Sequence, residues 1–308
     1  MNIGNKIKKY REQNKLTQKD IAEILKVEPG TISKYESGTI EPNIESIKKL
    51  AETFNITIDE LLKDDEIDIS KINLLQVLKE QKDMKLKGNL YYATQISFAY
   101  NTNHIEGSKL TEEQTRYIYE TNTILFEKDT IINVDDIQET INHFKLVDYM
   151  IDNATQKLTE EIIKKFHKIL KTGTSDSKKD WFNVGEYKKL ANEVGNVKTS
   201  SPRNVERDIK KLLDWYNLLE KITINDLIEF HYKFESIHPF QDGNGRVGRA
   251  IMFKECLKNN IIPLIIMDKD KLFYYRGLKE YKEEKGYLID TCLNAQDQYK
   301  KMIEYYLK

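Results

Sequence analysis

Residues 238–249 read HPFQDGNGRVGR, a stretch that combines a Gly-Asn-Gly turn with a histidine, a carboxylate and two arginines. Gly243 and Gly245 reach positive φ at little cost, so successive backbone N–H groups can converge on one point as an anion nest. The residues from Arg246 to Leu257 have a helical pattern, and the positive N-terminal end of that helix points at the same place. The stretch therefore predicts an anion-binding turn at the start of a helix.

The charged side chains of this stretch indicate which anion it binds. Arg246 and Arg249 lie three residues apart on one helix face and can each reach phosphate oxygens. Asp242 makes sense beside a phosphate if a divalent cation lies between them. His238 is near its neutral form at physiological pH and can take a proton from a hydroxyl group. Together these residues predict transfer of a phosphorus-centred group from a nucleotide to an alcohol, whereas a plain turn with a core histidine would leave their coincidence unexplained.

The composition limits the class of protein. The chain has 308 residues, enough for two domains with hydrophobic cores, and its net charge of −1 gives no overall field toward nucleic acid or membrane. Two cysteines are too few for a disulfide framework, which fits a reducing cytosol. No run approaches the roughly 18 apolar residues of a membrane span. We therefore expect a soluble, helix-rich, cytoplasmic protein without a membrane partner.

The first 63 residues have the periodicity of a compact helical unit. Apolar residues at helical spacing predict helices near 3–10, 18–26, 31–36 and 44–54, and a short fifth helix after Thr57. Thr17 offers an N-cap for the second helix, and a break at Val27–Gly30 precedes the third. The acidic stretch from Asp64 to Asp68 is the expected domain boundary.

Beyond this boundary the helical period is interrupted by one different pattern. In residues 189–199, Gly195-Asn196 separates two short runs, which is the sequence signal of a tight β-hairpin. The expected fold class is mainly α, with a five-helix N-terminal domain and a larger all-α domain that carries this hairpin. Helices of the larger domain are expected near 71–86, 88–103, 111–126, 134–153, 158–171, 203–219, 224–236, 244–259, 270–282 and 285–306.

The N-terminal unit resembles the helix-turn-helix domain of the lambda-repressor-like (XRE) family over about residues 3–62. The matching residues are Leu16–Ala22, Val27, Thr31–Gly38 and Pro42. In that family the second helix of the pair enters the major groove of DNA with its N-terminal residues toward the bases. The resemblance implies a DNA partner, with base contacts from Gly30, Thr31, Ser33 and Lys34 and phosphate contacts from Gln18 and Lys19.

The net charge of this unit limits the DNA affinity that we expect from it. Residues 1–40 contain eight Lys or Arg against five Asp or Glu, a net charge of +3. Such a charge supports only modest counterion release, so a monomer would bind DNA weakly and a dimer would be needed. A helical protein-interaction module with the same fold is the alternative.

The stretch 238–249 matches the signature of the Fic family, HPFx[D/E]GNGRxxR, without a departure. The resemblance extends over about residues 88–290 and includes His231, Gly185–Tyr187, the hairpin and Tyr274-Tyr275. Lys188 departs from the arginine that many relatives have after the tyrosine. The domains implied are a helix-turn-helix domain at 1–66, a linker and connecting helix at 67–87, and a Fic domain at 88–308.

The resemblance implies protein adenylylation, in which AMP moves from ATP to a Ser, Thr or Tyr hydroxyl of a protein target and pyrophosphate is released. His238 would be the general base, and Asp242 would hold Mg²⁺ between the α- and β-phosphates. The hairpin would be a flap that pins an extended target segment by strand addition. The nucleotide would be held by Gly243, Asn244, Gly245, Arg246, Arg249 and Tyr275, and the target would dock on Val197, Lys198 and Thr199.

A second motif upstream, TNHIEG at 102–107, resembles the inhibitory motif of the same family, [S/T]xxxE[G/N]. By itself it reads as a helix end, with Gly107 after the last turn. The resemblance implies an inhibitory helix at about 88–107, in which Thr102, Glu106 and Gly107 form the motif. Glu106 would pair with Arg249 and occupy the guanidinium that should hold the γ-phosphate. In some relatives this glutamate also supports AMP removal, and the sequence leaves that activity open here.

Two other functions remain open from the sequence. The first is a transcription regulator whose Fic domain senses nucleotides without transferring anything, although such a sensor needs neither His238 nor Asp242. The second is a Fic enzyme that uses another nucleotide or phosphocholine donor. The target protein, the DNA operator and the oligomeric state are also left open. A homodimer is one expected partner, because regulation in this class often couples to dimers.

Overall fold

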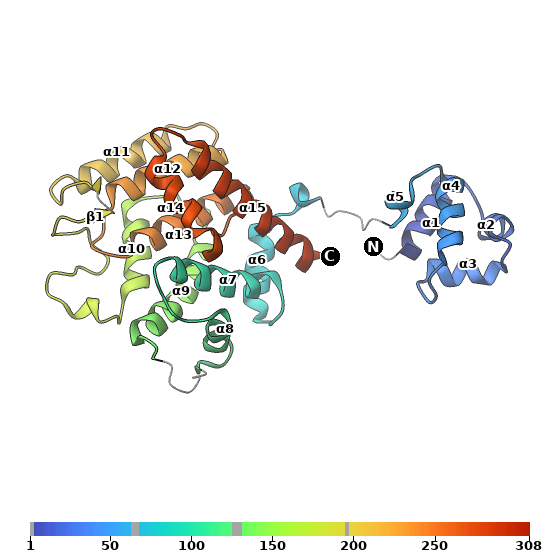
Figure 1. The fold of residues 1–308 in the computed structure, drawn as a ribbon, viewed down its shortest axis with the longest axis horizontal. Helices are drawn as coiled ribbons and strands as arrows, with labels where there is room; N and C mark the ends of the chain where they lie inside the picture. Colours follow the sequence, from blue (N-terminus) through green and yellow to red (C-terminus); the bar gives the residue numbers. More distant parts are fainter. Residues whose placement is uncertain (1–2, 63–67, 125–130, 195–196) are drawn as a thin grey trace. The chain divides into compact units, whose positions relative to one another are not determined.

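The computed structural model describes residues 3–62, 68–124, 131–194 and 197–308. The chain divides into two compact units, Met1–Asp68 and Ile69–Leu307 (Figure 1). Fifteen α-helices, three short 3₁₀ helices and two short strands make up the regular structure of the described residues, so the mainly α fold class is confirmed.

The N-terminal unit contains five helices around a small apolar core. These are α1 (Ile3–Gln13), α2 (Gln18–Leu25), α3 (Pro29–Glu36), α4 (Ile44–Phe54) and α5 (Ile58–Leu62). The start of α2 is set by a capping box, because the Thr17 hydroxyl accepts from the Asp20 N–H and the Asp20 carboxylate accepts from the Thr17 N–H. The core residues Ile7, Ile21, Ile32, Leu50 and Leu61 are fully buried.

One helix boundary in this unit differs from the sequence prediction. The start expected near Thr31 was wrong by two residues, because α3 begins at Pro29. A proline at the first helical position loses no helical hydrogen bond, since that N–H has no partner within the helix, and its fixed φ suits the turn. Helix α3 therefore includes Pro29 and Gly30, which the sequence suggested as part of a break at Val27–Gly30.

The second unit is a helical bundle with a small hairpin at its surface. Strand β1 (Glu193–Val194) pairs antiparallel with β2 (Val197–Lys198), with Glu193 opposite Lys198. The turn expected at Gly195-Asn196 lies outside the described residues. The helices of this unit are α6 (Leu74–Met84), α7 (Leu90–Ile105), α8 (Glu112–Thr121), α9 (Val134–Asp152), α10 (Glu160–Lys171), α11 (Val205–Asn217), α12 (Ile224–Ile237), α13 (Asn244–Lys258), α14 (Lys271–Glu280) and α15 (Gly286–Leu307).

Helix α13 is the centre of this unit. It packs against α6, α7, α9, α10 and α12, and 13 of its 15 residues are buried (Figure 1). A helix surrounded on all sides is apolar around most of its circumference, as Val247, Ile251 and Phe253 illustrate. Because α13 cannot shift without disturbing five neighbours, its N-terminus is a fixed point on which a site can be built.

Helix α6 packs on α7 and α9 and therefore belongs to the body of the second unit. Its side chains Leu74 and Leu78 are buried there. The segment 67–87, which the sequence suggested as a linker with a connecting helix, thus contributes a packed helix to this unit.

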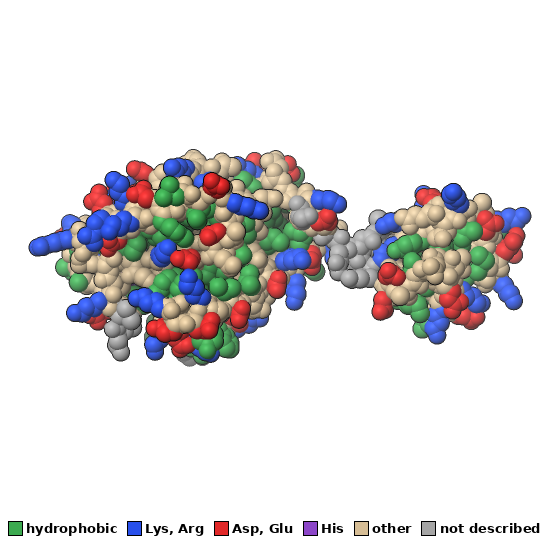
Figure 2. Space-filling model, turned by 90° about the horizontal axis from the view of Figure 1, so that it is seen from above, with side chains coloured by type: hydrophobic (Ala, Val, Ile, Leu, Met, Phe, Trp, Pro, Cys, Tyr) green, Lys and Arg blue, Asp and Glu red, His purple; other side chains and the backbone are tan. Residues whose placement is uncertain are grey.

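The surface carries charges of both signs. On the face drawn in Figure 2, basic and acidic side chains are interspersed over each unit, in keeping with the net charge of −1. No helix in the described part of the chain combines the length and the apolar composition that a membrane crossing requires.

Candidate active site

The loop between α12 and α13 is held in a special backbone conformation. His238 caps α12 with φ 52° and ψ 62°, the left-handed region that non-glycine residues seldom adopt. Gly243 precedes α13 with φ 80°, where a side chain would be strained. These two reversals turn the chain so that the imidazole and the amino end of α13 belong to one short loop.

Buried side chains fix this loop from both sides. Asn244 accepts from the Phe240 N–H at 2.7 Å and donates to the Phe240 carbonyl at 2.9 Å. His167 on α10 contacts the Asp242 carbonyl at 3.2 Å and stacks on the Phe240 ring. The Asn244 side chain is thus used to close the loop, and only its backbone N–H is left to face a ligand.

The first turn of α13 presents N–H groups without helical partners. Gly245 lies in this turn, and a Cβ built there would meet the Glu106 carboxylate oxygen at 2.3 Å and an Arg249 nitrogen at 2.9 Å. The close approach requires glycine. It also places a carboxylate of α7 directly over the helix N-terminus, where the anion nest was expected.

Arg249 is the partner of that carboxylate. Its guanidinium is buried and donates to Glu106 at 2.6 Å, to the Thr102 hydroxyl at 2.6 Å and to the Thr102 carbonyl at 3.0 Å. It also contacts the Tyr274 hydroxyl at 3.4 Å. Burial alone would lower the pKa of Arg249, but the charge of Glu106 outweighs it and raises that pKa. The structure therefore brings together Thr102, Glu106 and Arg249, as the sequence predicted.

The second arginine of the stretch is neutralised differently. Arg246 is buried and pairs with the Glu139 carboxylate of α9 and with Asp242, the latter at 3.0 Å. Lys171 on α10 donates to Glu139 at 2.6 Å and to the same Asp242 oxygen at 2.7 Å. Burial would raise the pKa of Asp242, but the charges of Arg246 and Lys171 lower it well below its usual range. Asp242 is therefore ionised at neutral pH.

The surroundings of Asp242 fit a magnesium ion that takes most of its ligands from a nucleotide. The two cations that hold this carboxylate are buried, whereas the Asp242 side chain itself is 47% exposed. No group of three or more His, Cys, Asp or Glu among the described residues could hold a metal by itself. Mg²⁺ needs only one or two protein carboxylates when phosphates and water supply the rest, so Asp242 suffices.

His238 is in a suitable state to accept a proton. Its pKa is lowered to about 4, first by burial and then by the nearby Lys188 ammonium, against the opposing charges of Glu106 and Asp242. Its Nδ1 atom is buried without a hydrogen-bond partner among the described residues. The imidazole is consequently neutral at physiological pH.

The end of α7 is tethered by the segment that follows α13. The Tyr275 hydroxyl on α14 donates to the Ile105 carbonyl at 2.9 Å. The Asp268 N–H donates to Asn101, and the Asp268 carboxylate lies 3.0 Å from His104 Nδ1. Tyr275, predicted as a nucleotide contact, thus bonds to the residue before Glu106 and is itself 40% exposed.

The hairpin residues predicted to dock a target lie at the surface next to this loop. Lys198 is exposed, and Thr199 is half-buried with its hydroxyl bonded to Asn192. The backbone of Val197 forms β2, and its side chain is outside the described residues. Leu190 N–H donates to the Gln241 side chain at 3.2 Å, which joins the hairpin arm to the loop after His238.

Three charged residues of the site were missed by the sequence reasoning. Glu139, Lys171 and Glu235 come from helices whose pattern gave no functional signal. Glu235 has a buried carboxylate oxygen without a partner among the described residues, and burial raises the pKa of its carboxyl to about 8. Lys171 and Glu139 could have been suspected only as charges on otherwise apolar faces of α10 and α9, since no local motif marks them.

The residues predicted to contact DNA lie in the N-terminal unit. Gly30, Ser33, Lys34 and Lys19 are exposed on α2 and α3, and Thr31 and Gln18 are partly exposed. Gln18 is partly buried and donates to Glu36 at 2.8 Å. Glu36 also pairs with Arg11 at 2.6 Å, so Gln18 takes part in a network that ties α2 to α3 and α1.

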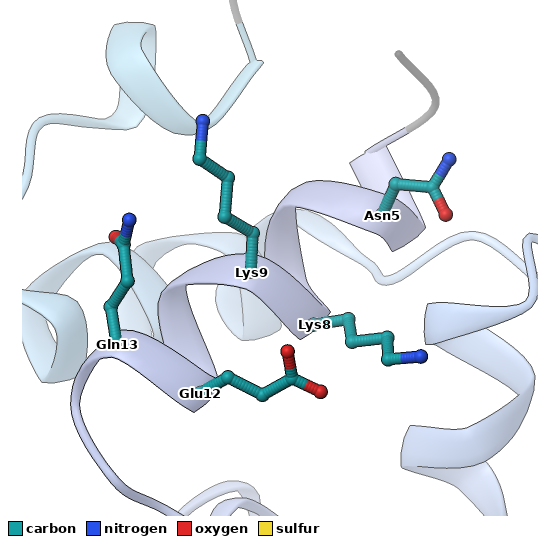
Figure 3. A pocket seen from close by; sticks show the side chains of 5 residues that line it. All are labelled: Asn5, Lys8, Lys9, Glu12 and Gln13. Carbon is teal, nitrogen blue, oxygen red and sulfur yellow. The ribbon is translucent and has the colours of Figure 1, made fainter.

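A shallow hollow of about 590 Å³ lies on α1 of the N-terminal unit (Figure 3). It is lined by polar side chains, namely Asn5, Lys8, Lys9, Glu12 and Gln13. None of the residues predicted to contact DNA or nucleotide lines it.

Comparison with family models and curated proteins gives two matches along the chain. Residues 157–256 match the Fic/DOC family and residues 7–61 match the helix-turn-helix model. The chain is 27% identical over 190 residues to "Protein adenylyltransferase Fic" of Nematostella vectensis, covering 59% of this chain and 42% of that protein. It is 26% identical over 193 residues to "Protein adenylyltransferase fic-1" of Caenorhabditis elegans, covering 60% and 36%. The chain thus spans less than half the length of these relatives.

Solved structures share the fold at lower identity. A Fic domain containing signaling protein from Bacteroides thetaiotaomicron superposes with a TM-score of 0.56 at 23% identity, over 77% of this chain and 92% of that one. A fragment of Fic-1 from C. elegans gives a TM-score of 0.58 at 18% identity, over 95% and 83%.

We expect the His238 imidazole to remain neutral in the folded protein down to about pH 4, because burial and Lys188 disfavour its charged form. The unfolded chain takes up this proton near pH 6.5, so stability contributed by neutral His238 is present above about pH 6.5 and is lost as the pH falls toward 4. NMR titration of the ring protons, assigned with His238→Gln, measures this. A peptide of residues 234–243 is the control, and a folded-state titration near its value contradicts the prediction.

Proposed function

Because residues 157–256 form a Fic/DOC domain and residues 7–61 a helix-turn-helix domain, we propose that this chain transfers AMP from ATP to a hydroxyl group of a protein and binds DNA through its N-terminal unit. The transferase would reside in residues 88–308. The curated relatives are named as protein adenylyltransferases, which supports the transfer at the level of the family.

The observation that carries the proposal is the Glu106 carboxylate at the amino end of α13. It lies against Gly245 in the first turn of α13 and accepts a hydrogen bond from Arg249, so an anion already occupies the space beside this helix N-terminus and guanidinium. A polyphosphate needs the same two partners. The pocket therefore has the chemistry of a phosphate site whose terminal position is filled by the chain itself.

The positions of these residues support a separate role for each of them around ATP. Backbone N–H groups of Gly243 to Arg246 would face the α- and β-phosphates, and Arg249 would receive the γ-phosphate once Glu106 leaves. Asp242 would hold Mg²⁺, which when bound supplies positive charge between the phosphates. The buried pairs with Lys171 and Glu139 keep Asp242 and Arg246 in place for these roles.

The transfer step needs one proton acceptor. His238, neutral at physiological pH, would take the proton from the target hydroxyl as that oxygen attacks the α-phosphorus. The new bond joins this oxygen to the α-phosphorus, and the bond from the α-phosphorus to the bridging oxygen breaks, so pyrophosphate leaves. The imidazolium afterwards returns the proton to solvent.

Glu106 would restrain this reaction from within the chain. While it occupies Arg249, ATP can bind only with its γ-phosphate displaced, and the α-phosphate is then misplaced for in-line attack. A charge-assisted hydrogen bond contributes roughly 1.5–3 kcal/mol, which corresponds to roughly 10- to 150-fold repression. AMP removal by water held at the same glutamate is a further activity that the proposal leaves to experiment.

DNA binding is proposed from the match of residues 7–61 and from the exposure of Lys19, Ser33 and Lys34. The N-terminal residues of α3 would enter the major groove, and Lys19 at the start of α2 would contact phosphate. Gln18 would reach a phosphate only by leaving Glu36, or would act indirectly by orienting α2.

The transfer proposal is tested with ATP labelled at the α or the γ position, Mg²⁺ and the full chain. We expect label on protein from the α position only, and we expect His238→Ala to abolish it while binding of a fluorescent ATP analogue is retained. The reason is that the imidazole accepts the proton but holds no phosphate. Undiminished labelling by His238→Ala would refute the base assignment. Tight binding without any label would favour a nucleotide sensor, and label from γ would favour another donor chemistry.

We expect Glu106→Gly to raise the rate of protein labelling by roughly 10- to 150-fold, because it frees Arg249 for the γ-phosphate. The measurement is the initial rate of incorporation from α-labelled ATP. Glu220→Gly makes the same change in the exposed loop between α11 and α12 and should leave the rate at the parent value. A Glu106→Gly chain no faster than the parent would exclude the restraint.

For DNA binding, we expect Lys19→Ala to reduce the slope of log K against log salt by about 1, because one phosphate contact is lost. The measurement is fluorescence anisotropy of a mixed-sequence duplex with the full chain at several salt concentrations. Lys48→Ala removes an exposed charge from α4 and should leave the slope unchanged. Equal slopes for all three proteins would favour the protein-interaction module.

A further inference from the structure

Lys188 is a buried cation at the foot of the hairpin. Its side chain is almost fully enclosed, and its ammonium donates to Asn192 Oδ1 at 2.6 Å, to Thr199 Oγ1 at 2.7 Å and to the Ile237 carbonyl at 3.4 Å. An ammonium has three donors and no acceptor, so these three oxygens use its whole capacity. The three hydrogen bonds of the Lys188 side chain therefore all start from one nitrogen.

The three acceptors belong to the two parts of the site that act on a target. Asn192 directly precedes β1, and Thr199 directly follows β2. Ile237 is the last residue of α12 and is followed by His238. One ammonium thus joins both ends of the hairpin to the residue before the proposed base.

Backbone hydrogen bonds join the same two parts of the chain as the Lys188 ammonium. The Lys188 N–H donates to the Pro239 carbonyl at 2.9 Å, and the Ser200 N–H donates to the Ile237 carbonyl at 3.3 Å. Asn192 also donates to the Phe240 carbonyl at 3.0 Å. The hairpin is consequently fastened to residues 237–240, the segment that sets the position of the imidazole.

No carboxylate in the part of the chain that the structure describes pairs with this cation. All three of its acceptors are neutral oxygens, and burial lowers the pKa of Lys188 to about 8. A buried charge held only by neutral dipoles is costly, and an apolar side chain of similar size would fill the same space at less cost. Compared with such an apolar side chain, Lys188 adds three hydrogen bonds that join the hairpin to Ile237.

We propose that Lys188 is a positioning residue that sets the hairpin relative to His238 and so places the target hydroxyl at the imidazole. The inference rests on the proposed transfer of AMP to a protein. The hydrogen bonds of its ammonium reach both ends of the hairpin and the residue before His238, and none of these three acceptors belongs to a residue proposed to hold the nucleotide. Its loss should therefore affect target placement and leave nucleotide binding intact.

The test compares Lys188→Met with Lys189→Met, which removes an exposed lysine one residue away. Both changes are made in the Glu106→Gly chain, where transfer is expected to be fast enough to measure. We expect Lys188→Met to speed amide exchange about tenfold in segments 189–194 and 197–200, because the lost hydrogen bonds loosen the hairpin. We expect its labelling rate to fall about tenfold while its affinity for a fluorescent ATP analogue stays within about twofold.

Two further variants keep the result interpretable. Lys188→Arg retains a cation with several donors and should keep more of the exchange protection than Lys188→Met, although its planar fork cannot aim three donors from one atom. Lys188→Gln retains an N–H donor without the charge and serves if Lys188→Met does not fold. If Lys188→Met does not fold, amide exchange, labelling rate and ATP affinity are measured on Lys188→Gln with the same expected results.

Unchanged exchange in the two hairpin segments would overturn the proposal. A labelling loss matched by an equal loss of ATP affinity would also overturn it, since Lys188 would then act on the whole site. Failure of the proposed function looks different. In that case the Glu106→Gly parent labels no protein at all, while the exchange experiment still reports whether Lys188 anchors the hairpin.

Discussion

The ion pair between the buried Arg249 guanidinium and the partly exposed Glu106 carboxylate is the contact on which the site of the second unit depends. A guanidinium enclosed on all sides needs a negative partner and filled hydrogen-bond donors, and α7 supplies both through Glu106 and the two oxygens of Thr102. This requirement brings the end of α7 onto the start of α13. Under the proposed function, an arriving polyphosphate would have to replace this carboxylate, so activity and inhibition would both depend on Glu106.

Buried cations near α13 are held by two different kinds of partner. Arg246 and Lys171 are enclosed and share the carboxylates of Glu139 and Asp242, while Lys188 is held by neutral oxygens. The first group holds Asp242 and Arg246 at the start of α13. The second joins the hairpin to the loop that carries His238. The proposed nucleotide side and the proposed target side are thus held by separate interactions, so variants can test them separately.

Local patterns accounted for much of the fold. The apolar period predicted the described helices of the second unit to within three residues at each end, with one exception. The helix expected to run to about residue 126 ends at Thr121, because Asn122 takes the left-handed conformation that ends a helix. Thr17 caps α2 where the sequence suggested. The error at α3 has a local cause, because Pro29 was read as part of a break although the first helical position accepts it. The residues of the 238–249 stretch were recognisable because turn, helix start and charged side chains are consecutive there.

The sequence by itself determined the elements whose physics is local: the helices, the glycine turn, the helix N-terminus and the order of His238, Asp242 and the two arginines. Apart from the pair of Glu106 and Arg249, which the family resemblance implied, the tertiary structure decided which charges meet. Glu139 and Lys171 lie 32 residues apart, and Lys171 lies 71 residues from Asp242. The Lys188 ammonium reaches the Ile237 carbonyl 49 residues further along the chain. Pairing across helices depends on how the helices pack, and packing is set by the whole apolar core, which no short stretch of sequence contains.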